Sequence, residues 1–260
     1  MRALAVAVLS LTLGASLGAD APIYSAASIV NAADNQSGTL APNTIGTIYG
    51  QNLAYGTQSL SQDEVQGGVL PTVFPGTGAR IIIGSVLANL IYVSPTQINF
   101  LVPPNLIPGT VNLNVVVDSW AGPSIAIQIA AASPALFQLD AQNAIATEAD
   151  GTLITPASPA RPGDIVILYA TGLGYTAPPV VYSQIPKMAA LIVQSATFIV
   201  QFNGVPMDPG GIIYAGIAPG FAGLYQINLI LPANVGANPQ ISIGYPDSMS
   251  PGGVTLPVQP

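Results

Sequence analysis

The chain contains neither cysteine nor histidine among its 260 residues. Their absence excludes Ser-His-Asp and Cys-His nucleophile systems, zinc sites of the usual ligands, haem and iron–sulfur attachment, and disulfide bonds. Most familiar catalytic chemistry is therefore unavailable to this protein. We predict that it is not an enzyme and that it holds no cofactor and no metal.

Charged residues are also scarce. Four Lys and Arg stand against 11 Asp and Glu, and charged residues make up 6% of the chain, where about 25% is typical of a soluble domain. So few cations cannot neutralise a run of phosphates, which excludes nucleic-acid binding and polybasic attachment to anionic lipid. A surface of uncharged polar residues also has little charge to discourage strand edges from pairing.

Long apolar runs are missing except at the N-terminus. An unbroken run of apolar and small residues covers 3–17, after Arg2 and before the small residues at 18–19. It is shorter than the roughly 20 residues of a membrane-spanning helix, and its flanks are typical of a secretory signal peptide. We predict a signal peptide over 1–20 and export to the extracellular space or cell surface, with the periplasm as an alternative. No transmembrane segment is expected in the mature chain.

After residue 22 the sequence consists of short apolar runs separated by Gly and Pro, which number 27 and 25. This spacing predicts an all-β protein, because a parallel α/β sheet needs helical crossovers of a dozen or more residues. Strands are expected at 44–49, 79–83, 87–93, 97–102, 110–117 and 124–130, and later at 164–169, 196–202, 211–215, 223–231 and 240–245.

An internal repeat is the most specific signal. The heptapeptide QINFLVP at 97–103 recurs as QINLILP at 226–232, and PNTIGTIYGQNL at 42–53 matches PGDIVILYATGL at 162–173 in the same order. A duplicated unit of this size, roughly 90 to 110 residues, indicates two tandem immunoglobulin-like β-sandwich domains. We predict a first sandwich at 21–130, a connecting segment at 131–160 and a second sandwich at 161–260.

Strand alternation divides the repeated heptapeptide into two faces. The outer face carries Gln97, Asn99 and Leu101 in the first copy, and Gln226, Asn228 and Ile230 in the second. We expect the four amides to bond backbone groups at a strand start or a sheet junction, with ligand binding as the alternative. The apolar Leu101 and Ile230 predict that each strand is covered on both sides near its end.

These signatures, together with APNTI at 41–45, YVSPTQINF at 92–100, ARPGD at 160–164 and APGFAGLYQIN at 218–228, resemble the Solibacter-type C-terminal domain family. That family is abundant in acidobacterial secreted proteins, and its repeats are similar to the IPT/TIG type of immunoglobulin-like fold. The resemblance covers about residues 28–258. It implies an extracellular β-sandwich and carries over no catalytic residues.

Acidic residues offer few catalytic or metal-binding arrangements. Glycoside hydrolysis needs two carboxyl groups about 5 to 9.5 Å apart across a cleft, and the close acidic pairs, Asp63-Glu64 and Glu148-Asp150, are expected in loops. Asp140 and Asn143 with the second pair could supply oxygens to calcium, but a solvated linker is the simpler interpretation. Around the turn at 162–163, the Asp164 carboxylate is expected to accept backbone N–H groups beside Arg161.

Aromatic residues fall into two groups. Four tyrosines at matching repeat positions are expected in the core: Tyr49, Tyr169, Tyr92 and Tyr214. Trp120, Tyr175 and Tyr182 lie in or beside Gly/Pro-rich loops, so we expect them to be the contacts for a ligand or partner.

The sequence thus predicts a secreted, non-enzymatic β-sandwich module for extracellular binding or adhesion, through protein or glycan contacts. The alternative is self-association into a structural subunit of an extracellular polymer or surface layer, and a distant third is a carboxylate-dependent glycan hydrolase. Assembly predicts a concentration-dependent mass, glycan binding predicts quenching of Trp120 fluorescence, and hydrolysis predicts new reducing ends.

Overall fold

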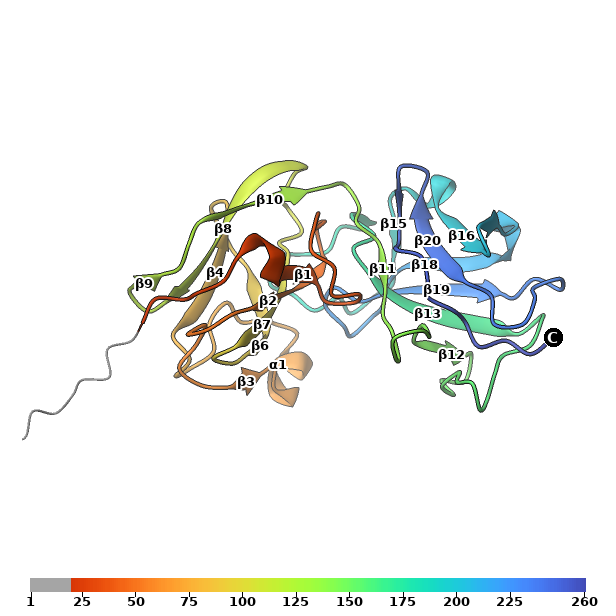
Figure 1. Cartoon of the computed structure of the whole chain (residues 1–260), viewed down its shortest axis with the longest axis horizontal. Helices are drawn as coiled ribbons and strands as arrows, with labels where there is room; N and C mark the ends of the chain where they lie inside the picture. The colour runs from red at the N-terminus through yellow and green to blue at the C-terminus, as the bar shows by residue number, and fades with distance from the viewer. Residues whose placement is uncertain (1–19) are drawn as a thin grey trace, which may run out of the picture.

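The computed structural model describes residues 20–260, which form two β-sandwiches arranged end to end along the longest axis of the molecule (Figure 1). The predicted signal peptide at 1–20 lies outside the described residues, apart from Asp20. Within the described part of the chain, helices that could cross a membrane are absent.

The first sandwich packs two antiparallel sheets. One has the strand order β1-β2-β7-β6-β3, and the other has the order β10-β8-β4-β5, with β9 paired to β8. Their bounds are β1 (Ile29–Asn31), β2 (Ile45–Tyr49), β3 (Gln58–Ser59), β4 (Ala79–Ile83), β5 (Val86–Leu87), β6 (Asn89–Val93), β7 (Gln97–Leu101), β8 (Gly109–Val117), β9 (Trp120–Ala121) and β10 (Ile125–Ile129).

The second sandwich repeats this arrangement. Its larger sheet has the order β11-β13-β19-β18-β15-β14, with β12 paired to β13, and its smaller sheet has the order β17-β16-β20-β21. Their bounds are β11 (Ala135–Leu136), β12 (Ala146–Glu148), β13 (Ile165–Thr171), β14 (Thr176–Ala177), β15 (Ala190–Ile192), β16 (Ile199–Phe202), β17 (Val205–Pro206), β18 (Ile212–Ile217), β19 (Tyr225–Ile230), β20 (Ile241–Tyr245) and β21 (Ser248–Met249). The all-β fold with two tandem immunoglobulin-like sandwiches is therefore as predicted.

Helices are short in the described residues. They are α1 (Gln62–Gly67) and the 3₁₀ turns η1 (Ala26–Ser28), η2 (Ser195–Thr197) and η3 (Pro209–Gly211). The acidic pair Asp63-Glu64 lies on α1, so the expectation of a loop there was wrong. Ser61 accepts a hydrogen bond from the Glu64 N–H, and the Glu64 carboxylate accepts one from the Ser61 N–H, a capping box that starts the helix.

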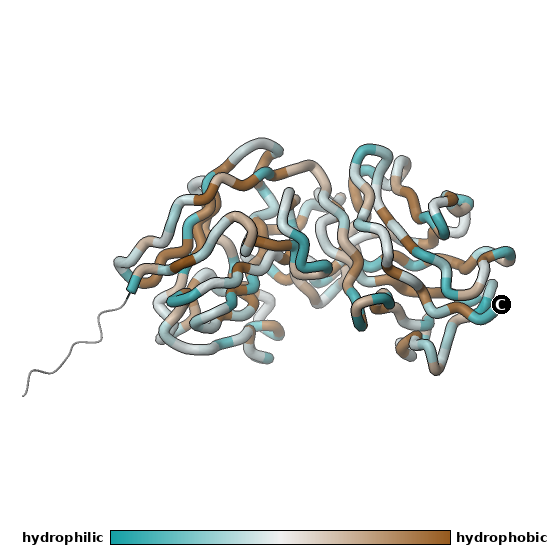
Figure 2. Tube along the Cα trace, viewed as in Figure 1, coloured by the Kyte–Doolittle hydropathy of each residue, from teal (hydrophilic) through white to brown (hydrophobic). Residues whose placement is uncertain are grey.

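Two separate hydrophobic cores lie between the paired sheets. Hydrophobic and hydrophilic segments alternate along the chain trace of both sandwiches (Figure 2). The first core draws its residues from Tyr24 to Ile129, and the second from Ala132 to Val258. The segment at 131–160, expected to connect the sandwiches, supplies β11, β12 and buried side chains to the second sandwich. The domain bounds at 21–130 and 161–260 stay predictions.

Two expected strands differ from those observed. The run at 87–93 is broken at the buried Ala88: β5 pairs with β4, whereas β6 pairs with β7 in the opposite sheet. An apolar run alone cannot reveal such a change of sheet. The run at 196–202 begins as the 3₁₀ turn η2 and becomes the strand β16 only at Ile199.

The four tyrosines assigned to the core lie instead on outer sheet faces. Tyr49 is exposed, and Tyr92, Tyr169 and Tyr214 are half-buried. The register explains this for Tyr49, because its partner Gln97 faces outward, and cross-strand partners share a face. The tyrosines buried in the cores are Tyr24, Tyr225 and Tyr245.

Candidate functional site

The three aromatic residues predicted to contact a ligand lie in different places. Trp120 is 47% exposed on β9, at the end of the first sandwich farthest from the second. Tyr175 donates a 2.6 Å hydrogen bond to the carbonyl of Leu106, and Tyr182 donates one of 2.7 Å to the carbonyl of Leu87. Both tyrosines thus connect the second sandwich to the first. Their role as ligand contacts stays a prediction.

In the first sandwich, the repeat-signature amides bond to other side chains. The Asn99 Oδ1 accepts hydrogen bonds from Gln97 Nε2 at 2.8 Å and from the Thr47 hydroxyl at 3.1 Å. Our expectation that these amides bond backbone groups was therefore wrong. The alternation of β7 places all three polar groups on the outer face, where they satisfy one another.

The second copy of this cluster is incomplete. Gln226 and Asn228 occupy the corresponding outer positions on β19, and Asn228 lies opposite Ile167 in the register. Ile167 stands where the first sandwich has Thr47, so the hydroxyl donor is missing. The Asn228 Oδ1 is consequently buried without a hydrogen-bond partner in the described part of the chain.

The turn that opens each repeat is built in the same way. The Asp164 carboxylate accepts a 2.7 Å hydrogen bond from the Arg161 N–H, as predicted, and the Thr44 hydroxyl accepts one of 3.0 Å from the Ala41 N–H. Each turn is closed by a backbone bond of 3.0 Å between the same positions, from Thr44 to Ala41 and from Asp164 to Arg161. Arg161 and Asp164 thus have a structural role at the start of β13.

The acidic residues considered as possible calcium ligands are Asp140, Glu148 and Asp150. Among residues 20–260 there is no group of three or more acidic side chains placed to hold a metal ion. Hydrogen bonds from Asn143 and the Gln142 N–H lower the pKa of the Asp140 carboxyl, so that carboxylate is occupied within its own turn. Burial, with the nearby charges of Asp164 and Asp150, raises the pKa of Glu148.

The junction between the two sandwiches is held by hydrogen bonds to side chains. The Ile45 N–H donates to the Thr171 hydroxyl at 2.9 Å, and this hydroxyl donates to the Gly223 carbonyl at 2.7 Å. At another point, Asn89 Nδ2 donates to the Ser183 hydroxyl at 2.9 Å. Bonds that cross the junction at several points hold the sandwiches in one relative orientation.

Apolar contacts fill the same junction. Leu101, at the end of β7, is 2% exposed and packs in a cluster with Leu70 of the first sandwich and Ile185 of the second. Ile45 and Ala222 pack against this cluster. The expectation that Leu101 is covered on its outer side is confirmed, and the second sandwich supplies Ile185 and Ala222 to that cover.

Two buried tyrosines stand just behind the junction. Tyr225 donates its hydroxyl hydrogen to the Gly174 carbonyl, and Tyr245 donates a 2.9 Å bond to the Leu173 carbonyl. Burial raises the pKa of both phenols well above the usual value. These bonds fix the loop that follows β13, which carries the residues facing the first sandwich.

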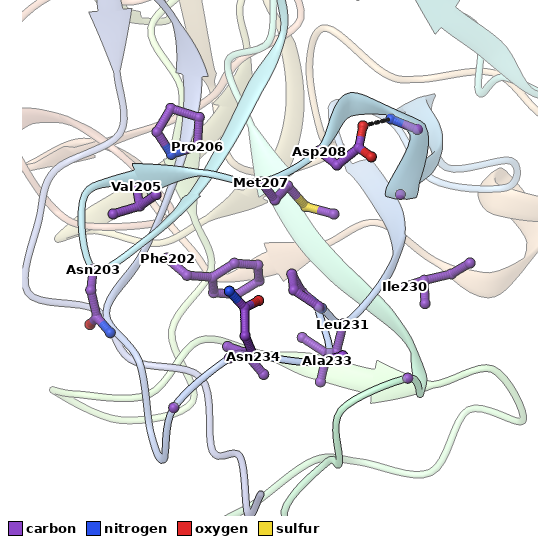
Figure 3. A pocket seen from close by; sticks show the side chains of 16 residues that line it. Phe202, Asn203, Val205, Pro206, Met207, Asp208, Ile230, Leu231, Ala233 and Asn234 are labelled. Carbon is purple, nitrogen blue, oxygen red and sulfur yellow. Dashed lines mark hydrogen bonds between the residues drawn. The ribbon is translucent and has the colours of Figure 1, made fainter.

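The free end of the second sandwich is hollowed. A groove of about 800 Å³ lies between the β16–β17 hairpin, η3 and the segment after β19 (Figure 3). Its lining is largely apolar, with Asn203, Asp208 and Asn234 as polar residues, and Asp208 caps η3 through the Gly210 N–H. The apolar side chains are Phe202, Val205, Met207, Ile230, Leu231 and Val235. Ile230 is 43% exposed, so the expectation that it is covered like Leu101 was wrong.

The free end of the first sandwich carries an aromatic ridge, which we define as Ile23, Tyr55 and Trp120. Tyr55 is 50% exposed, and its hydroxyl lies beside the carboxylate of Asp118, in the turn that leads to Trp120. Ile23 is also exposed and pairs with Gln51 at the same end. The molecule therefore presents an aromatic ridge at one end and an apolar groove at the other.

Sequence reasoning missed Tyr55 and most of the groove. The repeat contained the signal for Tyr55, because it follows Leu53 by two residues, as Tyr175 follows Leu173. The groove had no comparable signal, since Val205, Met207 and Val235 come together only through the pairing of β16 with β17 and the turn after β19.

Comparison with known families gives one match, the IPT/TIG domain, over residues 29–131. This range coincides with the first sandwich and supports an IPT/TIG-like immunoglobulin fold there. The finer resemblance to the Solibacter-type family stays a prediction. A comparison with curated proteins gives no match.

The solved structures that the chain matches include a surface glycan-binding protein, SGBP-B, of the Bacteroides ovatus mixed-linkage glucan utilization locus, at 11% identity and a TM-score of 0.34. They also include the surface glycan-binding protein PbSGBP-B of Prevotella bryantii, at 12% and 0.28, and domains 5-6 of the S-layer protein SbsC, at 10% and 0.27. The matches cover 85%, 91% and 91% of this chain. The chain spans 42% of each glycan-binding protein and 98% of the SbsC fragment.

Proposed function

We propose that this protein is an exported, non-enzymatic binding module that contacts extracellular protein or glycan through the two ends of its rod. The observation that carries the proposal is the contrast between the closed middle and the open ends. At the junction, Leu101 is fully covered, whereas Ile230 at the free end remains exposed beside a groove of about 800 Å³.

The groove is suited to binding and unsuited to hydrolysis. Its walls are mainly apolar, and Asp208, whose Oδ1 accepts a 2.9 Å bond from the Gly210 N–H, is its only acidic side chain. Hydrolysis of a glycosidic bond needs two facing carboxyl groups. An apolar groove with a few amides at its rim instead favours association by burial of surface.

The aromatic ridge supports the glycan form of the proposal. Trp120 and Tyr55 are flat side chains about half exposed, and sugars stack on such faces. Trp120 is the single tryptophan of the chain, so its fluorescence reports directly on that end of the molecule.

The experiment titrates the chain lacking residues 1–19 with soluble polysaccharides, including mixed-linkage β-glucan, and follows Trp120 fluorescence and calorimetric heat. Glycan binding predicts saturable quenching that is lost in Tyr55→Ala, while Tyr49→Ala, a similarly exposed tyrosine on a sheet face, retains it. An increase in reducing ends over time would contradict the non-enzymatic assignment. Absence of quenching with every polysaccharide would leave protein contacts as the only form of the proposal.

A further inference from the structure

One pair of facing apolar residues occurs at the same repeat position in both sandwiches but has different surroundings in each. Ile45 lies opposite Leu101 in the β2–β7 register, and Ile165 lies opposite Ile230 in the β13–β19 register. The first pair is covered by the second sandwich, and Leu101 is 2% exposed. The second pair is uncovered, with Ile165 and Ile230 exposed by 41% and 43%. The free end of the second sandwich therefore presents the surface that the first sandwich contributes to the junction, but nothing among the described residues is packed on it as the second sandwich is packed on the first.

The turn beside this pair is also repeated. The Leu106 N–H bonds to the Pro103 carbonyl at 3.4 Å, and the Val235 N–H bonds to the Pro232 carbonyl at 3.1 Å. Both turns follow the repeated heptapeptide at the same spacing. In the first copy, the Leu106 carbonyl accepts the hydroxyl of Tyr175 across the junction. Val235 holds the corresponding position and lines the groove.

The counterpart of Tyr175 lies at the opposite end of the molecule. Tyr55 follows Leu53 as Tyr175 follows Leu173, immediately after the matched segments at 42–53 and 162–173. Tyr175 is half-buried at the junction, whereas Tyr55 projects from the aromatic ridge. Two components of the internal junction, the Ile45–Leu101 pair and Tyr175, thus have a second copy outside it, one at each end of the molecule.

We propose that the groove of one molecule receives the aromatic ridge of a second copy of this chain, head to tail. In this junction the Tyr55 side chain takes the position of Tyr175, and its hydroxyl donates to the carbonyl of Val235 instead of to Asp118. The inference deepens the proposed function and rests on it, since it names the partner of the groove as a second copy.

The proposed junction differs from the internal one in the loop that covers the apolar pair. In the second sandwich, residues 218–224 join β18 to β19 and cover Leu101 and Ile45, whereas only residues 94–96 join β6 to β7 in the first. In the proposed junction, the short loop at 94–96 of the second copy would cover less of the Ile165–Ile230 pair than residues 218–224 cover of the Ile45–Leu101 pair. The large side chains of Trp120 and Tyr55 compensate for the area that the short loop leaves uncovered, because aromatic side chains bury large areas in an apolar groove.

The geometry makes the association open-ended. The ridge and the groove are different surfaces at opposite ends of the long axis (Figure 1), so each contact leaves a free ridge and a free groove. Contacts of this kind generate filaments, or rings where the rotation closes. The few charges of the chain, 6% of its residues, offer little repulsion to such contacts.

The test uses the chain without residues 1–19 and two end-specific variants, Tyr55→Ala at the ridge and Ile230→Lys at the groove. We expect the mass of the unmodified chain, measured by light scattering, to rise with concentration beyond that of a dimer. Each variant alone is expected to stay monomeric, because every copy lacks the same one of the two surfaces. An equimolar mixture has one intact ridge and one intact groove, so it is expected to form a heterodimer and nothing larger.

Two further variants serve as controls, one for the introduced charge and one for the hydroxyl of Tyr55. Leu191→Lys places the same charge at a residue 48% exposed on the outer face of the same sheet, and we expect it to assemble normally. Tyr55→Phe removes only the hydroxyl, so its association should be roughly five-fold weaker, as for the loss of one hydrogen bond.

Crosslinking tests the orientation independently. Because the chain has no cysteine, a short bismaleimide can join only introduced thiols. One is placed at the exposed Thr57→Cys, which leaves Tyr55 of the ridge intact, and the other at Asn234→Cys in the groove of the second chain. We expect the mixture to crosslink and each variant alone to stay uncrosslinked. A monomeric mass at every concentration, a symmetric dimer, or equal crosslinking of each variant alone would overturn the head-to-tail junction. Quenching of Trp120 by polysaccharide in a chain that stays monomeric would retain the proposed function while rejecting this partner.

Discussion

The hydroxyl of Thr171 accepts a hydrogen bond of 2.9 Å from the backbone N–H of Ile45 and donates one of 2.7 Å to the carbonyl of Gly223. A side chain of the second sandwich therefore satisfies the backbone N–H at the start of β2 in the first sandwich. Thr171 is fully buried, so water cannot replace it. Thr171 is therefore one of several contacts that hold the two sandwiches in one relative orientation.

Replacing Thr171 with valine should destabilise the protein by about 2 kcal/mol, because a buried N–H and a buried carbonyl lose their partners while the side-chain volume is kept. Thr171→Ser is the matched control, since it retains the hydroxyl and loses only a methyl group. Chemical denaturation measures the difference, and hydrogen exchange at the Ile45 amide should accelerate in the valine variant alone. Equal stability of the two variants would show that the hydroxyl does not support the junction.

Gly223 approaches the first sandwich so closely that a side chain cannot fit. A Cβ there would lie 2.6 Å from Ile45 Cγ1 and 2.6 Å from Leu101 Cδ1, and the backbone has a φ of +72°. We expect Gly223→Ala to cost about 2 to 4 kcal/mol, from overpacking and from backbone strain together.

Gly220 supplies the control for that substitution. It lies in the same loop with a φ of +85°, and a Cβ there would meet nothing within 4 Å. Gly220→Ala should therefore cost only the backbone term, about 1 to 2 kcal/mol. The excess for Gly223→Ala, measured by denaturation of both variants, reports the close approach of the sandwiches, and an excess of zero would mean that the second sandwich moves away without loss.

The repeat and the sandwich fold could be predicted because both depend on local pattern. Alternation along 97–102 placed Leu101 on the outer face correctly, and the covering of that face follows from an apolar residue in that position. The same reasoning failed for Ile230, whose local sequence is nearly identical. The difference lies in the residues that cover each side chain. Leu101 is packed against Ile185, 84 positions further along the chain, whereas Ile230 is 43% exposed and no segment among residues 20–260 covers it in this way.

The candidate contact residues show the same limit. Trp120 was correctly expected at the surface, because the Gly and Pro beside it prevent a long strand. Tyr175 and Tyr182 looked similar in sequence, yet both hydroxyls bond to carbonyls of the other sandwich. A tyrosine in a loop gives no indication of which distant carbonyl it will meet, and only the packing of the two sandwiches determines it.

Alkaline pH should loosen the second sandwich. Burial raises the pKa of Tyr225 and Tyr245 above the ordinary value of about 10, so an unfolded chain loses these protons at a lower pH than the folded one. Their contribution to stability is complete below pH 10 and is lost as the pH rises above it, by about 1.4 kcal/mol per pH unit for each phenol.

Denaturation across this pH range measures that slope. Tyr245→Phe removes one buried phenol, so its free energy of unfolding should fall less steeply above pH 10, although the lost bond to Leu173 costs about 1 kcal/mol at pH 8. Tyr49→Phe, on an exposed tyrosine, controls for the substitution itself. An unchanged slope in Tyr245→Phe would argue against its burial.

The incomplete amide cluster predicts a stabilising substitution. Asn99 Oδ1 accepts a 3.1 Å bond from Thr47, whereas Asn228 Oδ1 is buried opposite Ile167 with no donor among the described residues. Ile167→Thr places a hydroxyl in the position that Thr47 holds, and Ile167→Val removes similar volume without a donor. We expect the threonine variant to be more stable than the valine variant by about 1 kcal/mol, because an unsatisfied buried carbonyl gains its partner. Thermal and chemical denaturation of the pair measures the difference, and a more stable valine variant would mean that apolar packing on this face outweighs the hydrogen bond.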